Sequence, residues 1–165
     1  MTLVIHDLSK EEAAAFDFKE SRVISDNGRI RNCIGCFGCW VKTPGQCVIH
    51  DGYENVGSEL SKCSRLIIIS RCAYGCYSPF VKNVLDRIIS YVHPCFEIRN
   101  GEMHHKRRYD NEITVDLYMY GCGITEDEKK TAEGIVRANA VNFDGRAGRI
   151  AFAENAQELG GELIC

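Results

Sequence analysis

The stretch Leu66-Ile67-Ile68-Ile69 decides the fold of this chain. Four consecutive apolar residues are typical of a strand that is buried on both faces, as in the centre of a parallel sheet. A helix pattern follows, because Ser78 fits an N-cap and Pro79 fits the first helical position. The apolar stripe of this helix runs to Val92, and Pro94 is predicted to end it. A buried strand followed by an amphipathic helix is the repeating unit of a parallel α/β sheet.

The same alternation of strand and helix extends along the chain in both directions. Strands are predicted near residues 2–8, 21–26, 65–71, 113–120 and 149–153. Further helices are predicted to begin after Ser9, near Asp51 and after Thr125, and the first and last of these starts carry capping boxes. The pattern predicts one domain over residues 1–165, a doubly wound α/β fold with a five-stranded parallel sheet and helices on both faces.

Composition excludes several classes of protein. The chain has 165 residues, of which 45% are hydrophobic and 26% charged, as expected for a globular domain. A net charge of −3 does not favour a nucleic-acid partner. No apolar run approaches the length of a membrane span, and Met1 to Leu8 lacks the pattern of a signal peptide. Ten cysteines then indicate a reducing compartment, and we expect the protein in the cytoplasm.

A cysteine-rich loop at residues 33–47 is the strongest chemical signal. Cys33, Cys36, Cys39 and Cys47 follow the spacing C-x2-C-x2-C-x7-C. Four thiolates hold either an iron–sulfur cluster or a structural zinc ion. Zinc sites usually come as two separated C-x-x-C pairs, whereas the first three cysteines here are packed together as in ferredoxin-like cluster sites. A 4Fe–4S cluster is therefore the sharper interpretation, and four reduced cysteines without a metal remain the alternative.

Two other groups of candidate residues have simpler explanations. The adjacent residues His104 and His105 could bind zinc, but they lack helical i, i+4 spacing, so an exposed loop or a subunit contact is expected. Cys72 and Cys76 could be redox-active, although burial as small apolar residues is expected. Trp40, the only tryptophan, is expected to pack under the cysteine loop.

Three segments carry a resemblance to a known family. They are the cysteine loop, Tyr74-Gly75 followed by Ser78-x3-Lys82-x3-Asp86-Arg87, and Tyr120-Gly121-Cys122-Gly123-Ile124-Thr125. Together they cover roughly residues 30 to 140 and resemble the flavodoxin-like NAD(P)H-dependent FMN reductases. Within that group the compact cysteine spacing is most similar to the iron–sulfur flavoproteins.

The resemblance implies a flavodoxin-like sheet of strand order 2-1-3-4-5, with ligands at the carboxyl ends of the strands. It implies that Tyr74, Gly75 and Ser78 approach the flavin ring. Gly121 and Gly123 would let the backbone come close to the other edge of the ring. Lys82, Asp86 and Arg87 lie further along the same helix, where a solvated face with a salt bridge is expected.

One family feature is missing from the loop after the first strand. The family holds the FMN phosphate there on backbone amides and a helix N-terminus. This chain has Asp7-Leu8-Ser9-Lys10-Glu11-Glu12, which contains no glycine and three carboxylates. The sequence therefore predicts a degenerate phosphate-binding loop.

Three functions are consistent with these features. The leading hypothesis is an FMN-dependent NAD(P)H oxidoreductase or an electron-transfer protein of the iron–sulfur flavoprotein type, in which the cofactor carries the chemistry. A non-catalytic flavodoxin-like subunit that has lost FMN, or a metal-stabilised interaction module, is the alternative. Expected partners are flavin and a nicotinamide or another redox partner. The chain is expected to form a homo-oligomer or to pair with a related flavoprotein.

Overall fold

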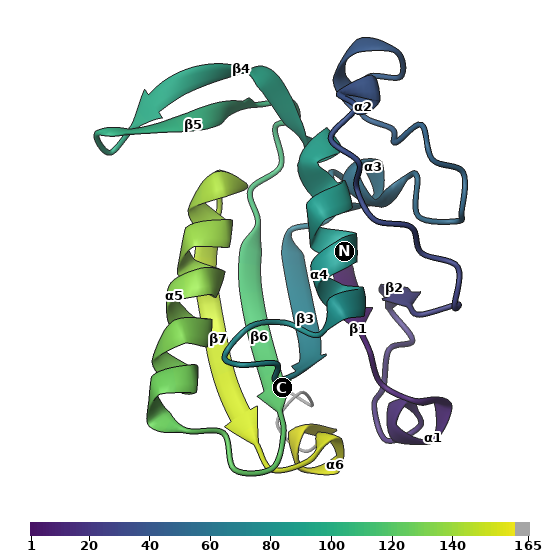
Figure 1. Cartoon of the computed structure of the whole chain (residues 1–165), viewed down its shortest axis with the longest axis vertical. Helices are drawn as coiled ribbons and strands as arrows, with labels where there is room; N and C mark the ends of the chain where they lie inside the picture. The colour runs from purple at the N-terminus through teal and green to yellow at the C-terminus, as the bar shows by residue number, and fades with distance from the viewer. Residues whose placement is uncertain (161–165) are drawn as a thin grey trace.

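A five-stranded parallel sheet forms the centre of the molecule. The structure is a computed structural model that describes residues 1–160. The strands of the sheet are β1 (Thr2–His6), β2 (Ser21–Ser25), β3 (Arg65–Arg71), β6 (Thr114–Tyr120) and β7 (Arg146–Ala153). They lie in the order β2-β1-β3-β6-β7 (Figure 1). Numbered within the sheet alone, this order is 2-1-3-4-5, so the predicted flavodoxin-like fold is confirmed.

The central strand β3 is buried on both faces, as its run of apolar residues predicts. It pairs in parallel with β1 on one side and with β6 on the other. Leu66 and Ile68 point into one hydrophobic cluster, and Ile67 and Ile69 point into a second cluster across the sheet. The strand therefore needs helices on both sides.

The two faces are covered unequally. The larger cluster packs under α3 (Val56–Leu60), α4 (Pro79–Arg87) and α5 (Glu126–Asn142). The smaller cluster packs under the segment around α1 (Lys10–Ala13) and under α6 (Ala156–Gly160). Both predicted capping boxes are present at the starts of α1 and α5. Within residues 1–160, no helix is long and apolar enough to span a membrane.

The segment after α4 differs from the prediction. A 3₁₀ turn (Ile88–Tyr91) follows α4, and the chain then forms an antiparallel hairpin of β4 (Val92–Arg99) and β5 (Glu102–Arg107). The prediction that Pro94 ends a helix was therefore wrong, because Pro94 lies inside β4. The hairpin extends away from the sheet (Figure 1).

Candidate functional site

A large cavity lies between the cysteine loop and the helices α4 and α5. Its volume is about 730 Å³, and its surface is mainly apolar. All four cysteines of the loop, Cys33, Cys36, Cys39 and Cys47, line it, and Cys76 lines it from the segment after β3. The four residues that the spacing predicts as metal ligands therefore line one cavity, and their role as ligands stays a prediction.

Backbone turns bend the cysteine loop around this cavity. Gly35 and Phe37 both have positive φ angles, 62° and 57°, which reverse the chain between successive cysteines. The short helix α2 (Gly38–Val41) then begins, and it places Cys39 in its first turn. The chain returns through a tight turn in which Gly45 also has a positive φ, 89°. Cys47 is then fixed by its amide, which donates to the carbonyl oxygen of Glu54 at 2.9 Å.

The four thiols differ in exposure but affect one another. Cys33 and Cys36 are exposed, Cys39 is half-buried and Cys47 is buried. Burial raises the pKa of Cys39, and the neighbouring sulfurs of Cys47, Cys33 and Cys36 raise it further. All are free thiols. The loop thus presents four sulfur donors to one apolar space.

The described residues do not gather their donors about a single ion. Tetrahedral zinc needs four donors gathered about one point, with Zn–S bonds of about 2.3 Å. Among residues 1–160, no three Cys, His, Asp or Glu side chains are gathered closely enough to hold one metal ion. In a 4Fe–4S cluster each thiolate binds a different iron, so its four donors lie further apart. Residues Cys33, Cys36, Cys39 and Cys47 could hold such a cluster from the walls of the cavity.

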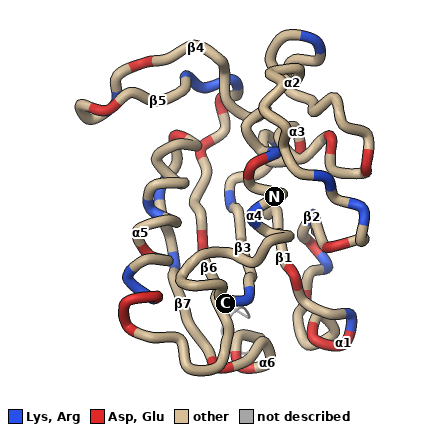
Figure 2. Tube along the Cα trace, viewed as in Figure 1, with Lys and Arg blue, Asp and Glu red and all other residues tan. Residues whose placement is uncertain are grey.

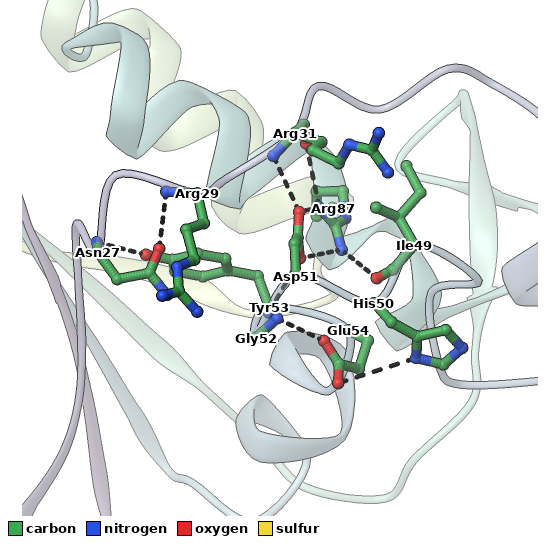
Figure 3. A network of polar contacts seen from close by, with 10 residues as sticks. All are labelled: Asn27, Arg29, Arg31, Ile49, His50, Asp51, Gly52, Tyr53, Glu54 and Arg87. Atoms are coloured by element: carbon green, nitrogen blue, oxygen red, sulfur yellow. Dashed lines mark hydrogen bonds and ion pairs between the residues drawn. The ribbon is translucent and has the colours of Figure 1, made fainter.

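Arg87 closes the neck of the cysteine loop (Figure 3). Its side chain is 0% exposed, and its Nη1 donates to the carbonyl of Arg31 at 3.0 Å, just before the first cysteine. Its Nη2 donates to the carbonyl of Ile49 at 3.1 Å, just after the last cysteine. Both nitrogens also bind the carboxylate of Asp51, at 2.8 and 3.1 Å. One guanidinium therefore ties the two ends of the loop to α4.

We call these contacts of Arg87 with Arg31, Ile49 and Asp51 the clasp. Asp51 accepts hydrogen bonds from three residues. Burial would raise the pKa of Asp51, but hydrogen bonds from Arg87 and from the amides of Arg31 and Tyr53 outweigh it and lower the pKa. The sequence-based expectation that Arg87 lies on a solvated helix face was wrong. Only the ion pair between Lys82 and Asp86 is on that face, with both side chains about half exposed.

Trp40 packs under the cysteine loop, as predicted. Its Nε1 donates to the carbonyls of Ile89 and Val92, at 3.2 and 3.0 Å. Its ring lies 5.5 Å from the ring of Phe37 and 4.9 Å from that of His105, measured between centroids. The indole thus joins the loop to the 3₁₀ turn after α4 and to the base of the hairpin.

The residues predicted to approach a flavin ring lie at the carboxyl ends of β3 and β6, outside the large cavity. Tyr74 has a positive φ of 56° and is 95% exposed. A Cβ at Gly75 would lie 2.8 Å from the carbonyl oxygen of Glu128, so this glycine permits close packing on α5. Ser78 is buried, caps α4 through its side chain, and donates its amide to Ser70. These contacts account for Gly75 and Ser78 without a ligand, so their flavin role stays a prediction.

The loop after β6 provides a much smaller depression at the same edge. Gly121 lines a hollow of about 190 Å³ together with Lys129 and Glu154. The amide of Gly123 donates to the carboxylate of Glu154 at 3.1 Å. A flavin role for Gly121 and Gly123 therefore also stays a prediction.

Most amides of the loop after β1 already have an acceptor within the protein. The Leu8 amide donates to His6 at 3.2 Å, and the Ser9 amide donates to the Glu12 carboxylate at 2.8 Å. The Glu12 amide donates to the Ser9 hydroxyl at 3.2 Å. Asp7 in turn accepts the Arg71 amide at 3.0 Å. Of the amides in this loop, only those of Lys10 and Glu11 have no acceptor among residues 1–160, and the loop carries three carboxylates, so it is a poor match to a phosphate-binding turn.

Charge opposes a phosphate at this edge as well. Figure 2 shows acidic segments at α1 and beside α6, close to the carboxyl ends of the strands. A dianionic phosphate would be repelled by these carboxylates. A flavin bound here would have to be held by its ring system.

The histidines that the sequence singled out lie on the hairpin, not in a loop. His104 contacts Asn142 at 3.1 Å and Glu102 at 3.2 Å, and His105 contacts the carbonyl of His93 at 2.9 Å. These contacts tie the hairpin to α5 and to its own strands. In the described part of the chain they form no metal-binding group.

Sequence reasoning missed the role of Arg87, although a signal for it was present. Arg87 lies three residues after Val84 and seven after Phe80, so helical periodicity places it on the apolar face of α4. An arginine on a buried face needs a partner, because a buried unpaired charge is strongly unfavourable. Its partner Asp51 is 36 residues away and read only as a helix start.

Comparison with known proteins supports the fold. No protein-family model and no curated protein matches the sequence. An azoreductase from Bacillus anthracis str. Sterne superimposes with a TM-score of 0.58 at 10% identity, covering 99% of this chain and 92% of that one. The Trp repressor binding protein from Bacillus subtilis gives 0.58 at 9% identity, covering 100% and 99%. An FMN-dependent NADH-azoreductase from Bacillus anthracis str. Ames Ancestor, in complex with FMN, gives 0.55 at 9% identity, covering 99% of each chain. At these identities the likeness shows the fold alone.

Proposed function

We propose that this chain is a redox protein of flavodoxin-like fold that holds a 4Fe–4S cluster on Cys33, Cys36, Cys39 and Cys47. One observation carries the proposal: the four thiols line a single apolar cavity of about 730 Å³. When bound, such a cluster supplies one-electron transfer. The protein residues would hold and orient it, exclude water through the apolar walls, and set its electrostatic surroundings.

A flavin is the second cofactor in this proposal. The loops after β3 and β6 converge at the carboxyl edge, where ligands bind in open α/β sheets. The solved neighbour described as an FMN-dependent NADH-azoreductase is in complex with FMN. Because most amides of the loop after β1 are already paired and its carboxylates repel an anion, we propose that the flavin is held by its ring, through Tyr74, Gly121 and Gly123. NADH or NADPH would be the electron donor.

The cluster is tested by anaerobic reconstitution of the purified protein with iron and sulfide. We expect brown protein with broad visible absorption, about four irons per chain as the named cluster requires, and loss of that iron in Cys36→Ser. Cys95→Ser is the matched control, because Cys95 is also exposed but lies outside the cavity. Iron content that Cys36→Ser leaves unchanged would remove these residues from the ligand set. Colourless protein with no bound iron would favour the non-catalytic subunit instead.

A further inference from the structure

Arg87 carries one buried donor that the protein itself does not use. Four hydrogen bonds to Arg31, Ile49 and Asp51 occupy Nη1 and Nη2. The Nε–H is buried and has no hydrogen-bond partner among residues 1–160. A buried charged donor without a partner lowers the stability of the fold, so an acceptor for this Nε–H is expected nearby.

The sulfur of Cys47 is a candidate acceptor for this donor. Both side chains are buried and line the same cavity, and Cys47 precedes by two residues the carbonyl of Ile49 that Arg87 holds. Burial alone would lower the pKa of Arg87, but the Asp51 hydrogen bonds and the adjacent Cys47 side chain outweigh it and raise the pKa. The guanidinium is thus held beside one of the four donors.

We propose that Arg87 is a positioning residue of the cysteine site. The two Nη atoms of its guanidinium hold the ends of loop 33–47 together, and its Nε–H and positive charge face the sulfur of Cys47. This inference rests on the proposed function, because the cluster supplies the charge on which Arg87 would act. Hydrogen bonds and charges near cluster sulfurs are known determinants of reduction potential.

The electrostatic consequence follows from the charge balance. Reduction by an external one-electron reductant adds one electron to the site, so the negative charge increases by one and no covalent bond changes. A fixed positive charge beside Cys47 favours this reduced state. Arg87 therefore raises the reduction potential, whereas a purely structural ion pair would close the neck and leave the potential unchanged.

Three variants separate these roles. Arg87→Lys keeps the charge but loses the planar fork. The double variant Arg87→Met with Asp51→Asn removes the positive charge beside Cys47 together with the negative charge of Asp51, so that no buried carboxylate is left unpaired. Lys82→Met is the matched control, since Lys82 is a cation of the same helix that lines the same cavity but is half-exposed and paired with Asp86.

Hydrogen exchange of the metal-free proteins tests the clasp independently of any cluster. We expect the backbone amides of residues 31–51 to exchange at least about tenfold faster in the double variant, and at the wild-type rate in Lys82→Met. Equal rates in the wild type and the double variant would overturn the clasp. This result stands even if wild-type protein binds no iron, which would be a failure of the proposed function.

Potentiometric titration of the reconstituted proteins tests the charge. We expect the double variant to be at least about tenfold harder to reduce, which is about 59 mV for one electron, with Arg87→Lys between it and wild type. A potential that the double variant leaves unchanged, or an equal shift in Lys82→Met, would overturn the electrostatic role of Arg87.

Discussion

At the scale of single residues, two carboxylates accept hydrogen bonds at the sheet edge where we propose that a flavin binds. The carboxylate of Glu12 accepts a hydrogen bond from the Ser9 amide. The carboxylate of Asp7 accepts hydrogen bonds from the Arg71 amide and the Tyr120 hydroxyl. The missing glycine predicted the loss of a phosphate site, but not these acceptors. The contacts of Asp7 join residues 64 and 113 positions apart, and such pairings depend on tertiary structure.

The first prediction concerns the phosphate of FMN. Wild-type apoprotein should bind riboflavin nearly as tightly as FMN, because the phosphate would find few free amides and three carboxylates beside them. Glu12→Gln keeps the cap of α1 but removes one negative charge, so FMN should bind up to about fivefold more tightly, since 1 kcal/mol is roughly the energy of one nearby charge in water. Riboflavin should be unaffected, and fluorescence titration with both ligands measures the ratio. Nanomolar FMN binding with much weaker riboflavin binding would show that the phosphate has a site.

The second prediction concerns pH and Tyr77, which lines the large cavity. Burial raises the pKa of Tyr77 to about 12, although its hydrogen bond from Asn139 opposes the shift. The unfolded chain releases this proton near pH 10, so the stabilisation is complete below pH 10 and is lost as pH rises toward 12. The loss should be about 2–3 kcal/mol, and Tyr77→Phe should abolish that part of the pH dependence.

Urea unfolding of wild type and Tyr77→Phe at pH 9 and pH 11.5 measures this difference. The other tyrosines and the lysines titrate in both proteins, so only the difference between the two proteins is informative. Identical slopes of unfolding free energy against pH would contradict the assignment.

At the scale of elements, strands were more predictable than the segment that follows α4. The five strands of the sheet follow from apolar runs, although β7 begins at Arg146, three residues before the predicted start. The prediction missed the hairpin because it ended a helix at Pro94 and did not consider the Asn100-Gly101 dipeptide. Both turn residues have positive φ, 53° and 84°, as a two-residue hairpin turn requires. That dipeptide was the available signal.

The third prediction uses two glycines in helices. A Cβ at Gly57 in α3 would lie 2.2 Å from the Ser90 hydroxyl and 2.8 Å from the Tyr91 amide nitrogen, so α3 and the 3₁₀ turn would have to separate. Gly57→Ala should therefore lower the free energy of unfolding by about 1–3 kcal/mol. Gly134 is exposed in α5 with nothing near its Cβ position. Gly134→Ala should raise stability by roughly 0.5–1 kcal/mol.

Chemical denaturation of both variants checks these opposite signs. A stable Gly57→Ala protein would mean that the close packing of α3 on the 3₁₀ turn is not as described.

At the scale of the whole molecule, the hairpin β4–β5 is the feature most open to association. Ile98 and Met103 form a cross-strand pair and are 69% and 66% exposed, and Phe96 lies on the same face. Large apolar side chains clustered on a protruding element often mark a contact surface. An oligomer, expected from the sequence, stays a prediction, and this face is where we place it.

The fourth prediction follows from that surface. Ile98→Lys combined with Met103→Lys should weaken self-association at least about tenfold, because burying two charges opposes the contact, while leaving the unfolding midpoint nearly unchanged. Sedimentation velocity over a range of concentrations measures the association. A wild-type chain that stays monomeric at high concentration, or an unaffected oligomer in the variant, would remove the hairpin from any subunit contact.

The position of iron in the molecule tests directly whether the cysteine loop holds an iron–sulfur cluster. Crystals of anaerobically reconstituted protein, measured across the iron absorption edge, locate the metal without assumptions about its ligands. We expect anomalous density inside the cavity, with Fe–S bonds of about 2.3 Å, similar to Zn–S bonds, to Cys33, Cys36, Cys39 and Cys47. Iron bound elsewhere, or a cavity without iron in protein that contains it, would exclude a cluster on these four cysteines.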